Sequence, residues 1–268
     1  VDDIPQNEEF ENAFKKIPRS ANASGFVDKA VVQMSGSLAK VKPCKIIHLK
    51  MNSLQLKEIS KKYNTTVTVY LLALMFLAGK AATDEHTGEM SIQVPVNMRK
   101  FYPSKTLRNF SMYCGIRIQI EDIKDLNSLT EKISMQLAQK SSKEEMDKML
   151  SATEKMVNML KYVPLAAKQS IAKAVYGFLG DKIFSNTLSN LGVVELPKCV
   201  SEQIESMDFI LGPGIENRAG CSVVTVNDTA VFSIDKTTSD PTFEEKMYEL
   251  LSKDGIEVIA EGSMNYEN

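Results

Sequence analysis

Two short segments of the sequence carry polar residues whose types and spacing could take part in chemistry. The first, Ser185–Gly192, reads SNTLSNLG, so hydroxyl and amide side chains alternate with leucines. The second, Ala230–Asp240, is an apolar run that ends in DKTTSD. Hydroxyl and amide groups can donate hydrogen bonds to a substrate, and carboxylates can hold or move protons. The lysine of this second segment, Lys236, is protonated near neutral pH and is therefore not a proton acceptor.

A purely structural interpretation of the first segment is also open. Ser-Asn-Leu-Gly is an ordinary way for a strand to end in a turn, in which Asn190 and Gly192 relieve backbone strain. Leu188 and Leu191 are placed to anchor such a strand in the core.

The two histidines and four cysteines form no recognisable site. His48 alternates with Ile47 and Leu49 in a strand-like pattern, and His86 lies in the polar loop DEHTGE. Neither has a Ser, Cys or carboxylate partner in an arrangement typical of catalysis, which favours surface or packing roles. The four cysteines lie far apart, which predicts reduced thiols and neither a disulfide nor a metal site. They are Cys44, Cys114, Cys199 and Cys221.

The hexapeptide TLSNLG, Thr187 to Gly192, resembles a known family motif. It is similar to the TISNLG-type motif in the acyltransferase domains of 2-oxo acid dehydrogenase complexes, which share a fold with chloramphenicol acetyltransferase. In that family a later strand ends in a DHRxxDG-type motif whose His is the general base. Here the matching stretch reads DKTTSDP. Asp235 and Asp240 keep the spacing, but Lys236 stands at the position of the base.

A longer stretch resembles the same superfamily. VPVNMRKFYPSKTLRNF, which begins at Val94, is similar to a segment of bacterial alcohol acetyltransferase-like proteins, relatives of the condensation domains of peptide synthetases. In those relatives the segment lies in the second half of the protein, near the seam between the halves. The matching positions are Asn97, Arg99, Arg108 and Asn109. Either they form a solvated turn, or one of the two arginines pairs with a carboxylate of the other half.

The resemblance implies an active site divided between two halves. In the superfamily, two copies of an α/β unit face each other across a tunnel. One copy supplies the base His of an HHxxxDG-type motif, and the other supplies an oxyanion-binding serine. A CoA thioester enters at one end and the acceptor alcohol or amine at the other. The sequence contains no HHxxxD motif. It therefore resembles the C-terminal half of an acetyltransferase-like protein, whose partner would be an N-terminal half with that motif.

The family motif implies a role for each polar residue of the first segment. It places Ser189 as the hydroxyl donor to the oxyanion, Asn190 as its rival, and Thr187 and Ser185 as substrate-binding positions. No tightly bound cofactor is implied, because a coenzyme A thioester is a cosubstrate of the parent enzyme. This chain alone would be inactive. The alternative is a non-catalytic binding or assembly module with a degenerate acyltransferase fold, which Lys236 at the base position supports.

The composition bounds the class of protein. The chain has 268 residues, of which 43% are hydrophobic, and that is ample for a sizeable core. Its 32 basic and 34 acidic residues are interspersed and give a net charge of −2, which does not indicate nucleic acid or an anionic membrane as the main partner. No apolar run approaches the ~20 residues of a membrane span. The sequence does not begin with a secretory signal, and the cysteine pattern favours the cytoplasm.

The pattern along the chain predicts an α/β fold. Residues 1–43 are polar and broken by Pro and Gly, which predicts a linker or arm with one short helix at 8–16 and a strand at 30–34. Residues 44–268 predict a chloramphenicol acetyltransferase-like C-terminal half-domain, a two-layer sandwich in which helices cover a mixed β-sheet. Strands are expected at 44–51, twice within 90–120, and at 185–192, 207–211, 220–226, 230–235 and 256–261; helices are expected at 54–63, 69–78, 126–139, 143–161, 164–178 and 240–251.

Such a half-domain would have a face that another half covers. We therefore expect an exposed apolar patch that leads to a homo-oligomer, or occupation of that face by the arm 1–43. The short stretch DFILGP, which starts at Asp208, is loosely similar to the DFGWG box of plant acyltransferases, and we interpret it as structural.

Overall fold

The computed structural model of the protein describes residues 4, 6–23, 29–40, 45–164, 167–169, 181–212, 214 and 217–262. The chain divides into two compact units. The first comprises Val1–Asp28, Pro95–Cys114 and Leu137–Leu179, and the second comprises Lys29–Val94, Gly115–Gln136 and Gly180–Asn268. Both segments that carry the candidate chemistry, SNTLSNLG and the run that ends in DKTTSD, belong to the second unit.

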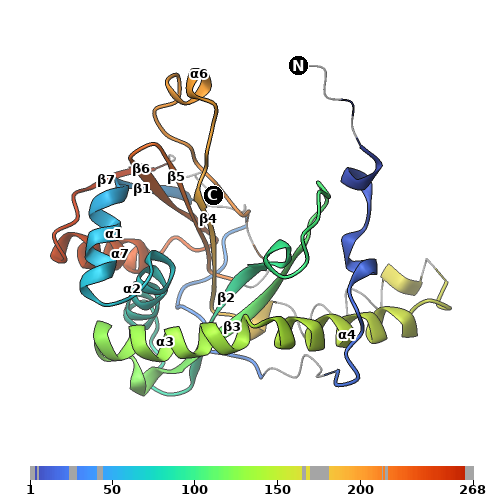
Figure 1. The fold of residues 1–268 in the computed structure, drawn as a ribbon. Coiled ribbons are helices and arrows are strands. Elements are labelled where there is room, and N and C mark those ends of the chain that lie inside the picture. The colour runs from blue at the N-terminus through green and yellow to red at the C-terminus, as the bar shows by residue number, and fades with distance from the viewer. Residues whose placement is uncertain are drawn as a thin grey trace. The chain divides into compact units, whose positions relative to one another are not determined.

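A seven-stranded mixed sheet organises the fold (Figure 1), with the strand order β3-β2-β4-β5-β6-β1-β7. Strand β4 pairs in parallel with β2 and β5, whereas β1 pairs antiparallel with β6 and β7, and β5 pairs antiparallel with β6. This sheet confirms the predicted mixed topology. The strands are β1 Lys45–Asn52, β2 Glu89–Asn97, β3 Ser111–Gln119, β4 Asn186–Val193, β5 Ala219–Val226, β6 Thr229–Lys236 and β7 Val258–Gly262.

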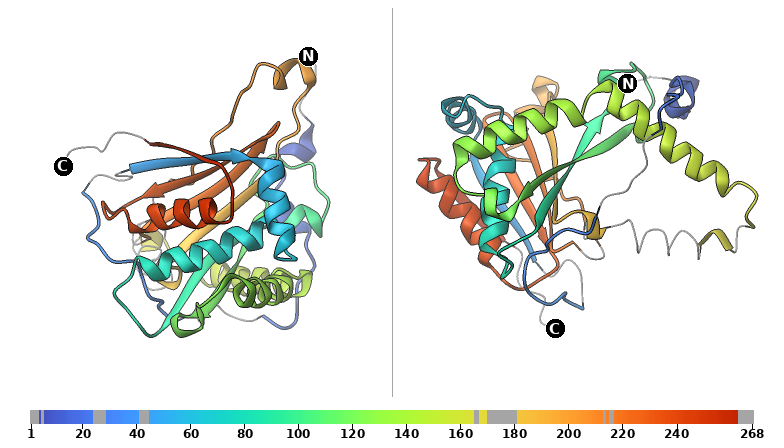
Figure 2. Two further views of the ribbon diagram at one scale, coloured as in Figure 1. Left: turned by 90° about the vertical axis from the view of Figure 1, so that its left-hand side faces the viewer. Right: turned by 90° about the horizontal axis from the view of Figure 1, so that it is seen from below.

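Helices cover one face of the sheet in the second unit (Figure 2, left), so the predicted two-layer arrangement is confirmed. They are α1 Ser53–Lys62, α2 Val67–Ala81 and α7 Thr242–Lys253. The other helices are α3 Leu126–Lys140, α4 Lys143–Met159 and the short α6 Lys198–Ser201, with 3₁₀-helices η1 Asn7–Phe10, η2 Ala13–Lys16, η3 Met98–Lys100, η4 Ile120–Asp122 and η5 Asp181–Ile183.

The apolar run predicted at 69–78 is the centre of helix α2. The Thr66 hydroxyl accepts a hydrogen bond from the Val69 amide and so caps the helix. Every residue from Val69 to Phe76 is buried, as expected for a helix that is apolar on all sides. No single helix in the described part of the chain is long and apolar enough to cross a membrane, and one bent pair, α1 with α2, reaches that length and composition together.

The two faces of the sheet can be assigned from the strand register. Leu188 of β4 is paired with Cys221 of β5, which is paired with Ile234 of β6 and, through it, Ile47 of β1. All four side chains are buried. Side chains directly opposite one another on paired strands point to the same face, so these residues form the layer beneath the helices. The residues between them along each strand point to the opposite face.

The N-terminal arm differs from its predicted structure. Residues 7–16 form two 3₁₀-helices where one helix was predicted. Residues 30–34 do not form a strand, although the amides of Val31 and Val32 donate hydrogen bonds to the carbonyls of Lys182 and Glu89. The Met34 side chain is buried. Residues 29–40 are therefore packed into the second unit.

Two further predictions concern the regions around β4. The strand predicted at 207–211 is wrong, because these residues have no regular secondary structure. The helix predicted at 164–178 lies mostly outside the described residues, as does Cys44.

Candidate functional site

Strand β4 changes its register at a bulge between Asn190 and Gly192. Ser189 lies opposite Ser222 of β5 and Asn190 lies opposite Val223, but the next pair joins Gly192 to Val224. Gly192 has a φ angle of +74°, a backbone conformation that side chains with a Cβ rarely adopt. The glycine of the SNTLSNLG segment thus allows the bulge, which re-aims the end of the strand.

Ser189 points to the face of the sheet that α2 and α7 do not cover. Its neighbour Leu188 is fully buried in the helix-covered layer, and successive strand residues alternate between faces. Ser189 is 9% exposed, and its hydroxyl has no hydrogen-bond partner among the described residues. The hydroxyl is therefore free to donate to a group that approaches this face.

Asn190 lies on the opposite face and is already engaged. Its Nδ2 donates to Thr68 Oγ1 at 2.9 Å, at the start of α2, and its Oδ1 accepts from the Gly192 amide at 2.7 Å. These two bonds support the structural interpretation of Asn190 and Gly192 as residues that shape the end of the strand. The expectation that Leu191 anchors the strand is wrong, because Leu191 is the bulged residue and is 52% exposed.

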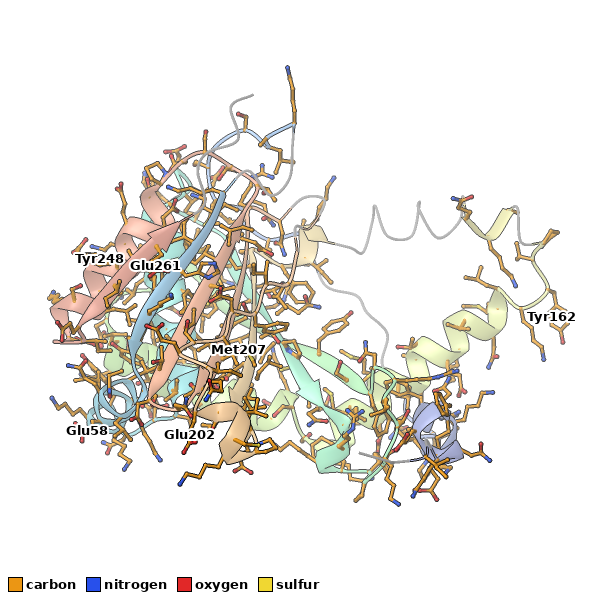
Figure 3. All side chains as sticks on the ribbon, turned by 90° about the horizontal axis from the view of Figure 1, so that it is seen from above. Glu58, Tyr162, Glu202, Met207, Tyr248 and Glu261 are labelled. Atoms are coloured by element: carbon orange, nitrogen blue, oxygen red, sulfur yellow. The ribbon has the colours of Figure 1, made fainter. Side chains whose placement is uncertain are left out.

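Ser189 stands at one end of a row of polar residues that runs across the sheet. Ser222 of β5, Ser233 of β6 and His48 of β1 follow it in register. The connection between β4 and β5, which carries Glu202 and Met207 (Figure 3), continues into residues that contact this row. The Ser222 hydroxyl donates to the Phe209 carbonyl. Ser222 and Ser233 are only 1% and 2% exposed, so Ser189 is the most accessible of the three serines.

His48 has partners, but they do not form a catalytic triad. Its Nδ1 lies 2.9 Å from Ser233 Oγ and 3.8 Å from Asp208 Oδ1. In a triad the hydroxyl and the carboxylate contact different nitrogens of the ring, whereas here both approach the same one. Ser233 is also too buried to attack a substrate. His48 is three strands from Ser189, roughly 14 Å at ordinary strand spacing, so one reacting carbonyl cannot contact both.

The two predicted substrate-binding positions differ in accessibility. Ser185 is fully buried, and its hydroxyl donates to the Val32 carbonyl at 2.6 Å while it accepts from the Ser91 amide at 3.1 Å. These bonds hold residues 29–40 beside β2 and leave Ser185 unavailable to a substrate. Thr187 is partly exposed on the same face as Ser189, and its hydroxyl donates to Gln93 Oε1 at 3.1 Å.

Lys236, which the resemblance predicts at the position of the base, has a structural role. It lies in register with residues of the helix-covered layer, and it is 1% exposed. Its ammonium forms an ion pair with Glu244 Oε2 of α7 at 2.6 Å and donates to the Asp240 carbonyl. The side chain therefore points away from the face of Ser189 and joins the end of β6 to α7.

Asp235 is a buried acid on the face that carries Ser189. It is opposite Gly220 in the register and 2% exposed. Burial raises the pKa of this carboxyl to about 7, and the nearby amides of Gly220 and Gly212 lower it in part. A Cβ at position 220 would come within 2.2 Å of Asp235 Oδ1, so a side chain there would overlap the carboxylate.

The basic turn between β2 and β3 lies in the first unit, where local contacts hold it. The Asn97 side chain accepts from the Arg99 amide, and the Asn109 side chain accepts from the Ser111 amide. Arg99 donates to the carbonyls of Thr106 and Arg108. The Arg108 guanidinium has no hydrogen bond or ion pair among the described residues. The turn interpretation accounts for Asn97, Arg99 and Asn109, and Arg108 is the arginine left for a partner.

No group of three or more His, Cys, Asp or Glu side chains in the described part of the chain could hold a metal ion. Of the cysteines that are described, Cys114 and Cys221 are buried and Cys199 is exposed, and all three are free thiols. Burial raises the pKa of the Cys114 thiol to about 11, so it is not a nucleophile at neutral pH.

Comparison of the fold with solved structures finds matches to one half of larger proteins. A trichothecene 15-O-acetyltransferase from Fusarium sporotrichioides matches with a TM-score of 0.59 and 12% identity, over 84% of this chain and 48% of the other. The epimerization domain from the third module of tyrocidine synthetase B matches with a TM-score of 0.54 and 10% identity, over 85% and 51%. The fold is one half of the chloramphenicol acetyltransferase and condensation-domain fold.

A third match to this half-fold is a cyclization-docking bidomain of a nonribosomal peptide synthetase from Sorangium cellulosum, with a TM-score of 0.52 and 14% identity, over 90% of this chain and 45% of the other. The chain thus spans about half the length of these structures. No protein-family model matches the sequence, and the search of curated proteins found no match. At these identities the likeness shows the fold and not the activity.

The sequence does not predict several contacts of the candidate residues and of their neighbours. Glu244 was not identified as the partner of Lys236, although a carboxylate eight positions further on was visible at the start of a predicted helix. The contacts of Asp208 with His48 and of Phe209 with Ser222 have no signal in the sequence, because the pattern of residues 207–211 predicts a strand.

Proposed function

We propose that the chain is the C-terminal half of a CoA-dependent acyltransferase, which supplies the oxyanion donor and one wall of the substrate tunnel. The single observation that carries this proposal is the Ser189 hydroxyl. It lies at the TLSNLG motif, on the face that α2 and α7 do not cover, without a hydrogen-bond partner among the described residues. A fixed donor of this kind stabilises the negative charge that develops on a thioester carbonyl oxygen during acyl transfer.

Within the proposal, Ser189 is preferred over Asn190 because of where each side chain points. Asn190 Nδ2 is bound to Thr68 on the helix side, so it would have to break that bond and cross the sheet to reach the same substrate. Thr187, on the same face two residues away, is placed to contact the substrate beside the reacting carbonyl. Ser185 is left out because its hydroxyl is buried and doubly bonded.

Among the described residues, the proposed site has no accessible general base. The Asp235 carboxyl lies on the same face but is only 2% exposed. Lys236 is directed to Glu244 behind the sheet, and His48 is three strands from Ser189. A second copy of this chain cannot supply the base, because the sequence contains no HHxxxD motif. The proposed partner is therefore a distinct half that carries an HHxxxDG-type motif, with a CoA thioester as cosubstrate and an alcohol or amine as acceptor. Arg108 is the residue we propose for an ion pair with that half.

One observation favours a second function, a non-catalytic binding or assembly module. A buried lysine in an ion pair stands where the family has its base, so this half could not regain the proton-transfer step by a small rearrangement of that side chain. The two functions differ in what Ser189 does. A module needs no donor at that position, whereas an acyltransferase half loses turnover without it.

The experiment that separates the two functions joins the chain to a half with the HHxxxDG motif, in one polypeptide or as two. Acyl transfer from acetyl-CoA is then measured for the wild type and for Ser189→Ala. Turnover that depends on Ser189 supports the acyltransferase half. Complex formation without turnover would support the module.

A further inference from the structure

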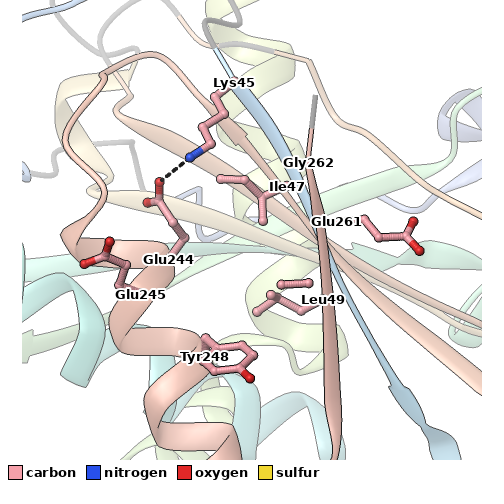
Figure 4. Close-up of a pocket in the computed structure, with 9 residues that line it drawn as sticks. Lys45, Ile47, Leu49, Glu244, Glu245, Tyr248, Glu261 and Gly262 are labelled. Atoms are coloured by element: carbon pink, nitrogen blue, oxygen red, sulfur yellow. Dashed lines mark ion pairs between the residues drawn. The ribbon is translucent and has the colours of Figure 1, made fainter. Parts of the chain in front are cut away.

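A groove unrelated to Ser189 lies between helix α7 and the edge of the sheet. It has a volume of about 570 Å³ and is lined by residues of β1, β7 and α7. Figure 4 shows Glu245 and Tyr248 of α7 on one side and Ile47 and Leu49 of β1 on the other. Tyr248 and Glu261, labelled in Figure 3, mark its position on the second unit.

The groove exists because the edge strand carries small residues on the helix side. Ala260 is opposite Leu49 in the register, and Gly262 is opposite Ile47. Neither Ala260 nor Gly262 has enough side chain to fill the space under α7. Ile47 and Leu49 therefore form an apolar floor, which suits a methylene chain.

The polar end of the groove contains a carboxylate oxygen without a hydrogen bond. Glu244 is 6% exposed, and its Oε2 is paired with Lys236, but its Oε1 accepts no hydrogen bond. The nearest cation beside Oε1 in the groove, Lys45 Nζ, lies 3.9 Å away, which is beyond hydrogen-bond range. A buried acceptor without a hydrogen bond lowers the stability of the protein. A ligand that donates a hydrogen bond to it therefore gains more binding free energy than an ordinary surface pair provides.

The charges and the aromatic wall of the groove favour a cation. Lys236 balances the charge of Glu244, and Glu245 adds a second carboxylate. Lys45 is the one ammonium among the residues that line the groove, so a cation is favoured where it takes the place of Lys45. Glu261 does not count toward the groove charge, because its carboxylate points to the other face and pairs with Lys50 at 2.7 Å. Tyr248, which is 43% exposed, offers a ring face to a passing cation.

We propose that this groove binds a primary alkylammonium group. The ammonium donates to Glu244 Oε1 and lies beside Glu245, while the alkyl chain packs on Ile47, Leu49 and Ala260. Lys45 is about one-third exposed and competes for the same oxygen, so the ligand displaces it. Either a free alkylamine or a lysine side chain of an extended peptide beside β7 has this chemistry.

The test measures binding of n-hexylamine and of n-hexanol to the whole chain by NMR titration of groove amides. A charge-assisted hydrogen bond to a buried acceptor predicts that the amine binds about tenfold more tightly than the alcohol. Glu245→Gln should weaken amine binding and leave alcohol binding unchanged. Lys45→Ala should strengthen amine binding, because it removes the competitor. Ala260→Leu fills the groove and should abolish both.

A matched control and two outcomes complete the test. Ile259→Ala changes the exposed neighbour of Ala260 on the other face of β7 and should leave both ligands unaffected. A lysine-containing tripeptide with blocked ends distinguishes the sources: tighter binding than the free amine identifies a protein segment, and weaker binding identifies a small amine. Equal affinity for amine and alcohol, or amine binding that survives Ala260→Leu, would overturn the proposal. Acyl transfer is not measured, so the outcome is independent of the proposed function.

Discussion

Ser189 and Asn190 are adjacent in the chain and point to opposite faces of the sheet. Asn190 is bound to Thr68 of α2 and to the Gly192 amide, whereas the Ser189 hydroxyl, on the face that α2 and α7 do not cover, has no hydrogen bond among the described residues. Asn190 therefore shapes the end of the strand, and Ser189 is the residue for which we propose a role toward a substrate. The following predictions test these roles separately.

Asn190→Ala should destabilise the protein more than Ser189→Ala does. The asparagine side chain makes two hydrogen bonds that hold the bulge against α2, and each is worth about 0.5–1.5 kcal/mol. Removal of the unbonded serine hydroxyl leaves no buried partner unsatisfied and almost no cavity, so its cost should be within about 0.5 kcal/mol. Urea denaturation of the two variants checks this order, and equal losses would contradict it.

The bulge also marks the limit of what the sequence could predict. The alternation of Leu188 with its polar neighbours correctly indicates a strand with one buried face. The same alternation placed Leu191 in the core, and that is wrong, because one extra residue in β4 moves Leu191 out of register. A local pattern cannot reveal a bulge, since it depends on the pairing with β5. Gly192 is the only signal of the bulge in the sequence, and a glycine is equally compatible with a simple turn.

Long-range contacts limited the prediction of the site in the same way. The mixed sheet, the buried helix α2 and the helix that starts after Asp240 follow from periodicity and capping signals. The ion pair of Lys236 with Glu244 depends on how α7 packs on β6, which no periodicity reports. The packing of residues 29–40 into the second unit could not be predicted for the same reason. It depends on the hydrogen bond between Ser185 and Val32, which are distant in sequence.

Lys236→Ala should be strongly destabilising, by about 3–5 kcal/mol, because it leaves the Glu244 carboxylate buried without its main partner. The double variant Lys236→Met with Glu244→Met removes both charges and keeps apolar volume, and it should recover most of that loss. Thermal unfolding of the three proteins measures the difference. If the double variant is as unstable as the single one, packing and not the unpaired charge explains the cost.

Asp235 should make the stability of the protein depend on pH between about pH 4 and pH 7. Its pKa in the folded protein is about 7, raised by burial above the value of 3.8 for an unperturbed aspartate. As pH rises, the unfolded chain therefore releases this proton at a lower pH than the folded protein does. The contribution of Asp235 to the free energy of unfolding is fully present below pH 3.8 and is lost as pH rises to about 7. Asp235→Asn should gain stability relative to wild type over this interval, by on the order of a few kcal/mol.

Asp240→Asn is a control, because the contribution of Asp240 to stability should depend on pH in the opposite direction. Hydrogen bonds from Thr242 lower the pKa of Asp240, so its contribution is present above the unperturbed value and is lost as pH falls below it. The Asp240 variant should therefore differ from wild type at neutral pH and approach it in acid. A stability difference between wild type and Asp235→Asn that does not change between pH 4 and pH 7 would contradict the assignment for Asp235.

The isolated chain should transfer no acyl group from acetyl-CoA to alcohols above background. No accessible group among the described residues near Ser189 can take the proton of the acceptor. Lys236 is bound to Glu244, His48 is three strands away, and the Asp235 carboxyl on the same face is only 2% exposed. Release of free CoA in the presence of alcohols measures this activity. Turnover that is lost in His48→Ala or His86→Ala would show that the chain has a base of its own.

Comparison of serine variants in a joined enzyme tests our proposal that Ser189 is the oxyanion donor of a divided active site. The chain is joined to a half that carries the HHxxxDG motif, and kcat for acyl transfer is compared for wild type, Ser189→Ala and Ser233→Ala. Ser233 is the matched control, because it lies in the same polar row but is buried beside His48. We expect Ser189→Ala to lower kcat by on the order of 10²-fold or more, with little change in KM for the acyl donor, and Ser233→Ala to leave kcat unchanged. An unchanged kcat in Ser189→Ala, in a joined enzyme that is active, would contradict it.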